Sequence, residues 1–390
     1  MKPNPLASIS LTDSVAAKIE QKVSGSDSPF SGTTDQAGHD ALASINIRDS
    51  VVKELHQTVN INILGGDVED LRSYMARNVH RRTKTRYIFV ACGREIRAYD
   101  PFRVNQGGAP DRIYRLPDAM GSARSVRLAR VQDRPHVLIG AQVGVVLFDL
   151  ETAEAQVYPF SRATQHGANS VAVLGEFIYA SHSDFGLSRW PLAGGAASRV
   201  LPDILKEGCR GVQVGEAGQL LVCTGDAVCR LDTTCSKSSL RLFQAPAGDP
   251  LVGAAQHGQH VYAATASGKL FQWEKEMPGS QPRLYARPGV KLYDLSLTPV
   301  AGGFSLVPSA RDGRVHVVRP GTRISTTHHH APDGVILRFA RASDDLVVAV
   351  DAAGTRLYLW DSDQTANPRA ELFLQNTGRA VINDLCLLSI

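Results

Sequence analysis

Basic and amide side chains recur beside glycines at five points of the chain, and they are the residues best suited to bind a ligand. They are Arg124, Asn169, Arg210, Lys291 and Arg379. Guanidinium groups bind carboxylates and phosphates through paired hydrogen bonds. If these residues gather, they form a mostly basic ring, interrupted by Asp249 and Asp333, that suits an acidic peptide or a carboxylate or phosphate ligand. Alternatively, they form turns and ion pairs between repeated units and bind nothing.

Three adjacent histidines, His328, His329 and His330, are a second candidate for chemistry. Ligands of a structural metal site converge from separated positions, and neighbouring residues cannot all face one ion. We therefore expect a polar surface loop here rather than a metal site.

The six cysteines lack the close pairing of a disulfide framework or of zinc ligands, which indicates a reducing compartment. They are Cys92, Cys209, Cys223, Cys229, Cys235 and Cys386. Cys223, Cys229 and Cys235 are spaced by six residues, but the first two fall on opposite limbs of one expected hairpin. We interpret them as small buried strand residues rather than metal or redox groups.

No catalytic set is visible in the sequence. There is no nucleophile elbow, no phosphate-binding glycine loop and no H-E-x-x-H pair, because Gly93, Gly144 and their equivalents are hairpin glycines with no helix after them. We expect a protein that is not an enzyme and that carries no cofactor and no metal.

Composition indicates a soluble protein of the cytoplasm. The 390 residues are 43% apolar and 21% charged, and the net charge of +4 is too small for a dedicated polyanion binder. The N-terminal stretch lacks the apolar region of a signal peptide, and no run of about 18 apolar residues follows. Residues 77–86, RNVHRRTKTR, are basic enough to contact nucleic acid, but a solvated linker explains them better.

A glycine-centred hairpin pattern recurs seven times between Tyr87 and Asp361. It is marked by Gly93, Gly144, Gly186, Gly225, Gly268, Gly313 and Gly354, and successive marks are 51, 42, 39, 43, 45 and 41 residues apart. This is the period of a four-stranded propeller blade. Such a fold hosts enzymes, lectins and docking platforms alike, so it does not settle the function.

An apolar strand precedes each hairpin except the first, while residues 380–388 form an apolar strand with no hairpin after it. The economical prediction is that this terminal strand is the innermost strand of the first blade. Residues 85–390 are thus expected to form an all-β, seven-bladed propeller closed by the C-terminal strand.

The preceding residues have a repeat of their own. Leu6–Val15 and Leu42–Val51 match at seven of ten positions, and residues 24–38 between them are rich in Ser, Gly, Asp and Thr. Such short strands cannot bury a face alone, so we expect residues 1–66 to be a β-repeat that stacks on itself, on another protomer or on a partner. Residues 67–84 are expected to be a helical, basic linker.

Two resemblances add to this interpretation. Hairpins that end in Arg97-Ala98-Tyr99-Asp100, Arg189-Trp190, Gln272-Trp273-Glu274 and Leu357-Tyr358-Leu359-Trp360-Asp361 resemble WD40 and related YVTN-type propellers over residues 85–390, although only Trp360-Asp361 has the Trp-Asp pair. The pattern I-x-I-x-D-S-V-V of Ile45–Val52 resembles a segment of bacterial multidomain proteins found beside signalling or conflict-system modules.

These resemblances imply a non-catalytic scaffold that docks a protein partner, such as an ATPase or signalling protein, with homo-oligomer formation through the N-terminal segment. The alternative is a ligand-binding or enzymatic propeller that uses the basic ring for an acidic metabolite or a sugar.

Overall fold

The computed structural model divides the chain into two compact units, Met1–Arg77 and Asn78–Ile390. In the second unit it describes residues 85–389 except 102–108, 162–165, 206–207, 216–217, 288–289, 301–302, 320–324, 344, 363–367 and 374–380. In the first unit it describes six strands. The basic run at 77–86 and the helix expected at 67–84 fall almost wholly outside the described residues.

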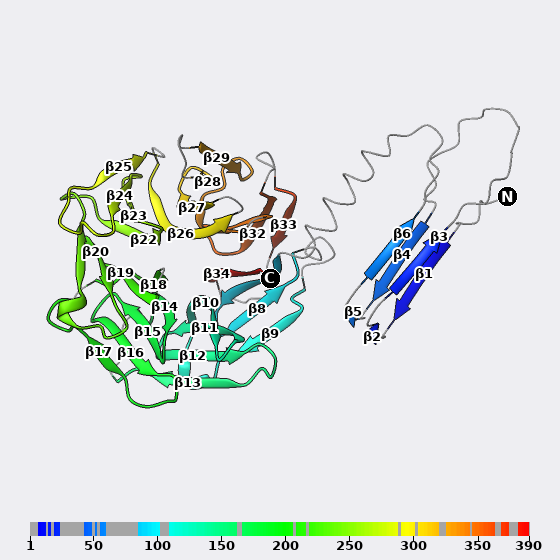
Figure 1. Cartoon of the computed structure of the whole chain (residues 1–390), viewed down its shortest axis with the longest axis horizontal. Coiled ribbons are helices and arrows are strands. Elements are labelled where there is room, and N and C mark those ends of the chain that lie inside the picture. The colour runs from blue at the N-terminus through cyan, green and yellow to red at the C-terminus, as the bar shows by residue number, and fades with distance from the viewer. Residues whose placement is uncertain are drawn as a thin grey trace, which may run out of the picture. The chain divides into compact units, whose positions relative to one another are not determined.

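Six four-stranded antiparallel sheets of the second unit are each built from four consecutive strands, and they are arranged around a centre (Figure 1). The first is β10 (Ala123–Val131), β11 (Arg134–Ala141), β12 (Gly144–Asp149) and β13 (Ala155–Pro159). The second is β14 (Ser170–Leu174), β15 (Phe177–His182), β16 (Gly186–Pro191) and β17 (Ser198–Val200). The third is β18 (Gly211–Gly215), β19 (Gln219–Cys223), β20 (Ala227–Leu231) and β21 (Arg241–Gln244).

The other three consecutive sheets complete this set. The fourth is β22 (Leu251–His257), β23 (His260–Thr265), β24 (Leu270–Glu274) and β25 (Arg283–Ala286). The fifth is β26 (Leu292–Val300), β27 (Gly303–Ala310), β28 (Arg314–Arg319) and β29 (Ser325–His330). The sixth is β30 (Leu337–Ala342), β31 (Leu346–Asp351), β32 (Arg356–Asp361) and β33 (Ala370–Phe373). Two short 3₁₀ turns, η2 (Asp118–Met120) and η4 (Lys237–Ser239), lie in connections.

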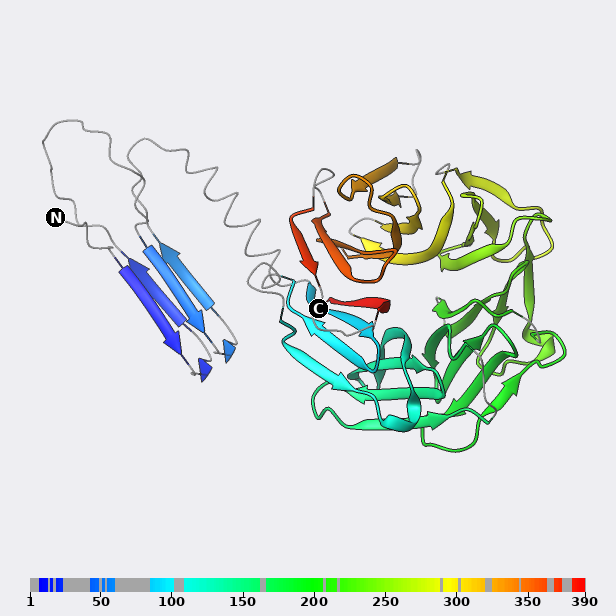
Figure 2. The ribbon, with the colours of Figure 1, turned by 180° about the vertical axis from the view of Figure 1, so that it is seen from behind.

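A further four-stranded sheet combines distant parts of the chain; we call it the mixed sheet. Its order is β34 (Ile382–Ser389), β7 (Thr85–Cys92), β8 (Glu95–Tyr99) and β9 (Arg112–Arg115). β34 pairs antiparallel with β7, so that Ile382 lies opposite Cys92 and Leu385 opposite Val90. β34 also contacts β10 on one side and β30 on the other. Figure 2 shows the same arrangement from behind.

The burial of each strand follows its place in its sheet. Second and third strands such as β15 and β12 are buried at nearly every position, while the outermost strand β13 buries only Tyr158. Strands covered by neighbouring sheets on both faces need continuous apolar sequence, whereas a solvated edge strand does not. The apolar runs of the sequence are therefore the inner strands of a propeller.

The apolar core lies between neighbouring sheets rather than in one centre. One cluster of buried residues joins Leu138 of β11 to Ile178 of β15, and another joins Tyr179 of β15 to Val222 of β19. The mixed sheet follows the same rule, because Ile88 and Leu385 pack with Val348 of β31. Each sheet is thus stabilised mainly by burial against the next one.

Several hairpin glycines are required by close contact between sheets. A Cβ on Gly268, which has φ +87°, would lie 2.1 Å from the carbonyl oxygen of Val290 before the next sheet, and one on Gly313 would lie 2.5 Å from that of Val335. Gly144 has an ordinary φ, but its Cβ would meet the Tyr158 carbonyl at 2.5 Å. The repeated glycines therefore record the tight packing of successive units as well as turn geometry.

The N-terminal unit contains three parallel strand pairs. β1 (Ala7–Thr12) pairs with β4 (Ala43–Arg48), β2 (Val15–Ala16) with β5 (Val51–Val52), and β3 (Ile19–Val23) with β6 (Leu55–Val59). Each pair is a two-stranded sheet. The first repeat of the sequence thus lies beside the second.

The prediction of an all-β propeller is confirmed, but two local predictions are wrong. His328–His330 form part of β29 rather than a surface loop, because this segment pairs with β28, and His329 is fully buried. Cys235 is buried as expected but lies in a turn after β20 rather than in a strand.

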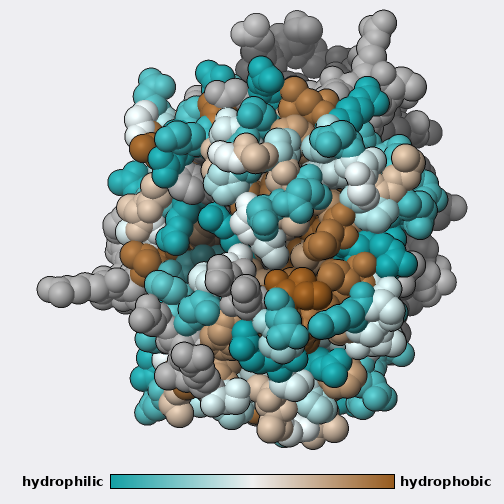
Figure 3. Space-filling view, turned by 90° about the vertical axis from the view of Figure 1, so that its left-hand side faces the viewer, coloured by the Kyte–Doolittle hydropathy of each residue, from teal (hydrophilic) through white to brown (hydrophobic). Residues whose placement is uncertain are grey.

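On one side of the propeller, apolar residues gather near the middle of a mostly polar surface (Figure 3).

Candidate functional site

A central cavity of about 330 Å³ is the candidate functional site. Residues from the first strands of the sheets line it, including β10, β14, β18, β22, β30 and β34. Its size is within the range of small-ligand pockets, about 300–1,000 Å³. Because the strands that line it come from all around the propeller, the cavity exists only when these sheets are assembled.

The lining of the central cavity is strongly basic. Five of its described residues are arginines and one is acidic: Arg124, Arg127, Arg210, Arg338, Arg341 and Asp384. A concave site lined by one sign of charge raises the local concentration of oppositely charged ligands. The lining of the cavity is therefore complementary in charge to an anion.

Asp384 on β34 is held by two of these arginines. Arg341 Nη2 of β30 donates to Asp384 Oδ1 at 3.0 Å, and Arg127 Nη1 of β10 donates to Oδ2. The backbone N–H groups of Val126 and Leu385 donate to the same carboxylate at 3.1 and 2.9 Å. Asp384 is only 6% exposed. This buried carboxylate fixes the inner strands of three sheets relative to one another.

The remaining three arginines are not neutralised. Arg124, Arg210 and Arg338 form no salt bridge with a described carboxylate, and Arg124 Nε is buried without a hydrogen-bond partner among the described residues. Leaving a buried donor unsatisfied costs about 1–3 kcal/mol. The cavity thus carries three positive charges without a described counter-ion.

The predicted site residues are distributed over more than one hollow. Arg124, Asn169 and Arg210 line both the central cavity and a wider adjoining hollow of about 640 Å³, which we call the mouth. Lys291 lines a separate side pocket of about 480 Å³, which it shares with Arg210. Arg379 lies outside the described residues.

Asn169 has a structural role within this group. Its Nδ2 donates to the Ser183 hydroxyl at 2.7 Å and to the Cys209 carbonyl at 3.0 Å, just before β18. Asn383 is similar, since its Nδ2 donates at 2.7 Å to the carbonyl of Ala123, the first residue of β10. The two asparagines thus connect neighbouring sheets.

The side pocket contains an ionised carboxylate. Burial acts to raise the pKa of Asp249, but hydrogen bonds from Ser267 and Lys269 outweigh it and hold the pKa below its usual value. Lys269 Nζ lies 3.0 Å from Asp249 Oδ2. Asp249 therefore offsets part of the charge of Lys291 and Arg210. Asp333, the other predicted acidic interruption, is exposed and does not line these hollows.

Sequence reasoning missed the arginines that lie within strands. It considered only loop residues beside glycines, whereas Arg127, Arg338 and Arg341 belong to β10 and β30. The signal is present in the sequence, because Arg127 and Arg338 interrupt the apolar runs that precede two of the hairpins, and Arg341 follows the second of these runs. A charged residue in an innermost strand points to the axis or to an ion pair, since the sheet faces are covered by apolar packing.

Three cysteine thiols that could act as nucleophiles are buried. Burial raises the pKa of the Cys209, Cys229 and Cys386 thiols to about 12, which disfavours the reactive thiolate. In the part of the chain that the structure describes, no group of three His, Cys, Asp or Glu residues could hold a metal ion. Over the same residues, no helix has the length and apolar character needed to cross a membrane.

Comparisons with known proteins bear on the fold. No protein family model and no curated protein matches the chain. Among solved structures, a chain of the mitotic checkpoint complex is 12% identical with a TM-score of 0.56, over 69% of this chain and 82% of that one. The fold is a β-propeller.

Two other structures are similar. The computationally designed Ika8 protein is 14% identical with a TM-score of 0.52, over 78% of this chain and 94% of its own. The extracellular domain of a putative hybrid two-component system, BT4673 of B. thetaiotaomicron, is 13% identical with a TM-score of 0.50; the match covers 68% of this chain and 36% of that chain. At such identities the likeness extends to the fold alone.

Proposed function

We propose that the propeller is a non-catalytic docking platform that binds acidic groups of a protein partner at its central cavity. The main support for this proposal is a set of three arginines that form no salt bridge with a described carboxylate. Arg124, Arg210 and Arg338 line both the central cavity and the mouth. Guanidinium groups bind carboxylates bidentately, and acidic segments are recognised by arginine clusters in this way.

We further infer that the mixed sheet serves as a seventh blade, which makes the platform a closed ring with β34 as its closing strand. The pairing of β34 with β7, its contacts with β10 and β30, and the position of Asp384 between Arg127 and Arg341 support this inference. A closed ring has no exposed innermost edge and holds the arginines in fixed positions.

The absence of catalysis is part of the proposal. The hydroxyl of Ser170, which lines the cavity, donates to the Val212 carbonyl at 2.9 Å, so it is engaged in joining sheets. The Cys223 thiol donates to the Thr224 carbonyl at 3.5 Å. An activated nucleophile is instead placed beside a general base. The native setting that we propose is a bacterial signalling or conflict-type complex with an ATPase or signalling partner.

Charge reversal tests this function. The full chain is titrated with a fluorescent oligoglutamate peptide, and fluorescence anisotropy is compared between wild type, Arg210→Glu and Arg338→Glu. Both side chains are exposed, so packing is retained. We expect each variant to weaken binding at least about tenfold, or about 1.4 kcal/mol.

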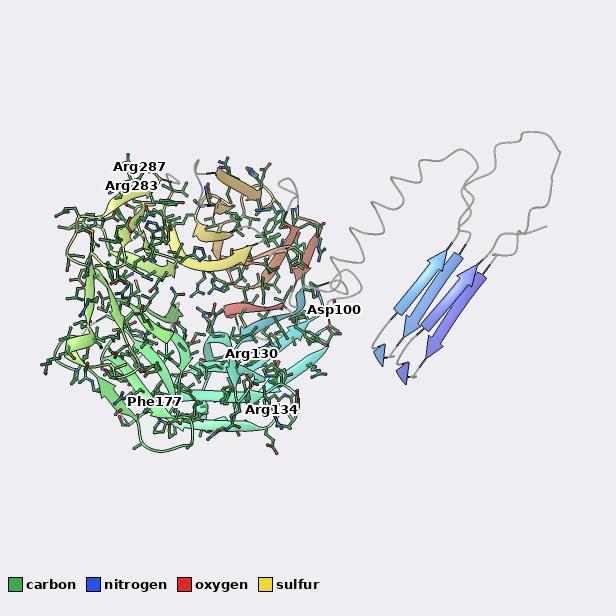
Figure 4. All side chains as sticks on the ribbon, in the orientation of Figure 1. Asp100, Arg130, Arg134, Phe177, Arg283 and Arg287 are labelled. Atoms are coloured by element: carbon green, nitrogen blue, oxygen red, sulfur yellow. The ribbon has the colours of Figure 1, made fainter. Side chains whose placement is uncertain are left out.

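The matched control is Arg283→Glu, which changes the charge equally. Arg283 lies on β25, at the outside of the propeller (Figure 4). We expect its affinity to stay within about twofold of wild type. Equal losses in all three variants would mean that only net charge matters, and no binding by the wild type would contradict the proposal.

A small acidic metabolite is the second candidate, because the central cavity of about 330 Å³ fits a small ligand. The melting temperature of the chain, measured with citrate and with inorganic phosphate, distinguishes metabolite binding from protein docking. Stabilisation by these anions without binding of oligoglutamate favours the metabolite. Binding of oligoglutamate with recovery of one acidic protein from the native host, lost in Arg210→Glu, favours the docking platform.

A further inference from the structure

The N-terminal unit has a register that can continue from one molecule to the next. Ala7 pairs with Ala43, Val15 with Val51 and Ile19 with Leu55, so the offset is 36 residues in each case (43 − 7, 51 − 15 and 55 − 19). The two repeats therefore lie side by side in parallel, each residue beside its own counterpart.

The two repeats lie side by side as a stack of two units, and such a stack is incomplete. Each of the three sheets has only two strands, so every described strand of the N-terminal unit has one edge without a partner strand. Two-stranded sheets are marginal in water, and stacked repeats need about three or more units for stability. An unpaired edge is also a template for another strand.

We propose that a second copy of this chain fills these edges. Its first repeat pairs with the second repeat of the preceding copy, in parallel and at the same register as within one chain. The geometry that already joins β1 to β4 and β3 to β6 needs no change for this. Because such a contact is head-to-tail and leaves a new edge each time, it produces an open-ended stack rather than a closed dimer.

Charge at the register positions favours this alternation of repeats. Glu20 lies opposite His56, Lys22 opposite Thr58 and Thr12 opposite Arg48. Stacking of a first repeat on another first repeat would place Glu20 beside Glu20 and Lys22 beside Lys22, and like charges directly opposite each other destabilise a sheet. Stacking of first on second repeats avoids every such pair.

Positions with identical or similar apolar or amide residues in both repeats are compatible with either order of repeats in the stack. Ile9 lies opposite Ile45, Val23 opposite Val59 and Gln21 opposite Gln57. Identical residues in register, including glutamines, are the arrangement found in cross-β stacks. The partner that fits this surface best is therefore the same sequence.

Single cysteines in the full chain test the order of the stack. We expect that Gln21→Cys and Gln57→Cys, mixed and treated with diamide, form a disulfide between one copy of each variant. Each variant alone should form none, because its cysteines would be two strands apart, about 9.6 Å, and a disulfide requires Cα atoms within about 7 Å. The wild-type chain is the control, since all six native cysteines are buried.

A proline pair tests whether the strands carry the assembly. Gln57→Pro removes a backbone donor in β6, whereas Gln36→Pro places the same residue in the segment between the repeats. Light scattering of the full chain should grow with concentration for wild type and Gln36→Pro and stay at the monomer for Gln57→Pro. A disulfide in the Gln21→Cys variant alone, a fixed dimer at every concentration, or a monomeric wild type would overturn the proposal.

Discussion

At the scale of single residues, the three tryptophans occupy comparable places on third strands but differ in one hydrogen bond. Trp190 Nε1 donates to the Pro159 carbonyl at 3.0 Å, and Trp360 Nε1 to the His330 carbonyl at 3.1 Å, each reaching the outer strand of the preceding sheet. Trp273 is equally buried, but its Nε1 has no partner among the described residues.

This difference predicts that replacing the three tryptophans lowers the free energy of unfolding by unequal amounts. We expect Trp190→Phe and Trp360→Phe to lower the free energy of unfolding by about 1 kcal/mol more than Trp273→Phe, because only they lose a hydrogen bond and leave a carbonyl unsatisfied. Urea unfolding of the three variants measures this directly. Equal losses would mean that ring volume alone determines the contribution of these tryptophans.

A buried histidine makes stability depend on pH. His182 on β15 is fully buried, stacks on Phe185 at 3.9 Å between ring centroids and meets Phe160 edge-on at 4.7 Å. Burial lowers its pKa from 6.5 to about 4. The unfolded chain therefore binds a proton below pH 6.5 that the folded chain does not, and stability falls as the pH drops from 6.5 towards 4.

We expect this single group to remove about 2 kcal/mol of stability between pH 7.5 and pH 5. The comparison is His182→Phe, which keeps an aromatic ring and cannot be protonated. Denaturant unfolding at the two pH values should show a loss smaller by that amount in the variant. A parallel decline in both proteins would assign the acid sensitivity to other groups, such as His316, whose pKa burial also lowers.

Residue-scale features differed in how far the sequence could reveal them. Arg124 and Arg210 could be selected because a basic residue close to a turn glycine is a local pattern, although Arg124 lies at the start of β10. Asp384 could not, because it becomes a buried partner of Arg127 only when residues 257 positions apart meet. His329 was misassigned because burial of a histidine strand depends on Trp360 packing against it, 6.1 Å away between ring centroids, in the next sheet.

At the scale of elements, β34 has the largest predicted effect, because it contributes to two clusters of the core and carries Asp384. We expect a chain that stops at Arg379 to lose the cooperative unfolding of the whole propeller rather than a terminal strand alone, since β7 would expose an edge and Arg127 and Arg341 would lose their carboxylate.

Circular dichroism with thermal melting checks this, and the control is a chain that lacks residues 1–77. That deletion removes the other compact unit and should leave the melting temperature of the propeller unchanged. A soluble, monodisperse chain that stops at Arg379 and melts at the wild-type temperature would contradict the closing role of β34.

Element boundaries were predictable where the pattern repeats. The hairpin glycines marked the turns because backbone crowding, such as Gly268 against Val290, excludes any side chain there. The apolar run before the last hairpin begins at Val335, two residues before β30, because an apolar residue in a turn looks like the beginning of a strand. The parallel pairing of the N-terminal repeats could not be read from the sequence, since similarity alone does not distinguish a hairpin from a stack.

At the scale of the whole molecule, the two proposals assign separate tasks to the two units. The propeller would bind an acidic partner through its cavity, and the N-terminal repeat would join copies of the chain. Linked binding sites act on one another through effective concentration, so a stack would hold a multivalent partner much more tightly than one propeller does. The distinction is measurable, because Gln57→Pro should leave the affinity for a monovalent oligoglutamate unchanged.

The pairing of β7 with β34 also has a consequence for synthesis. Cys92 cannot pair with Ile382 until the ribosome has added Ile382, 290 residues later (382 − 92). At about 5–20 residues per second, this delay is roughly 15–60 s. Throughout it, the nascent chain presents the edge of β7 without its partner strand, so translation speed and chaperone supply set how many chains reach the folded state.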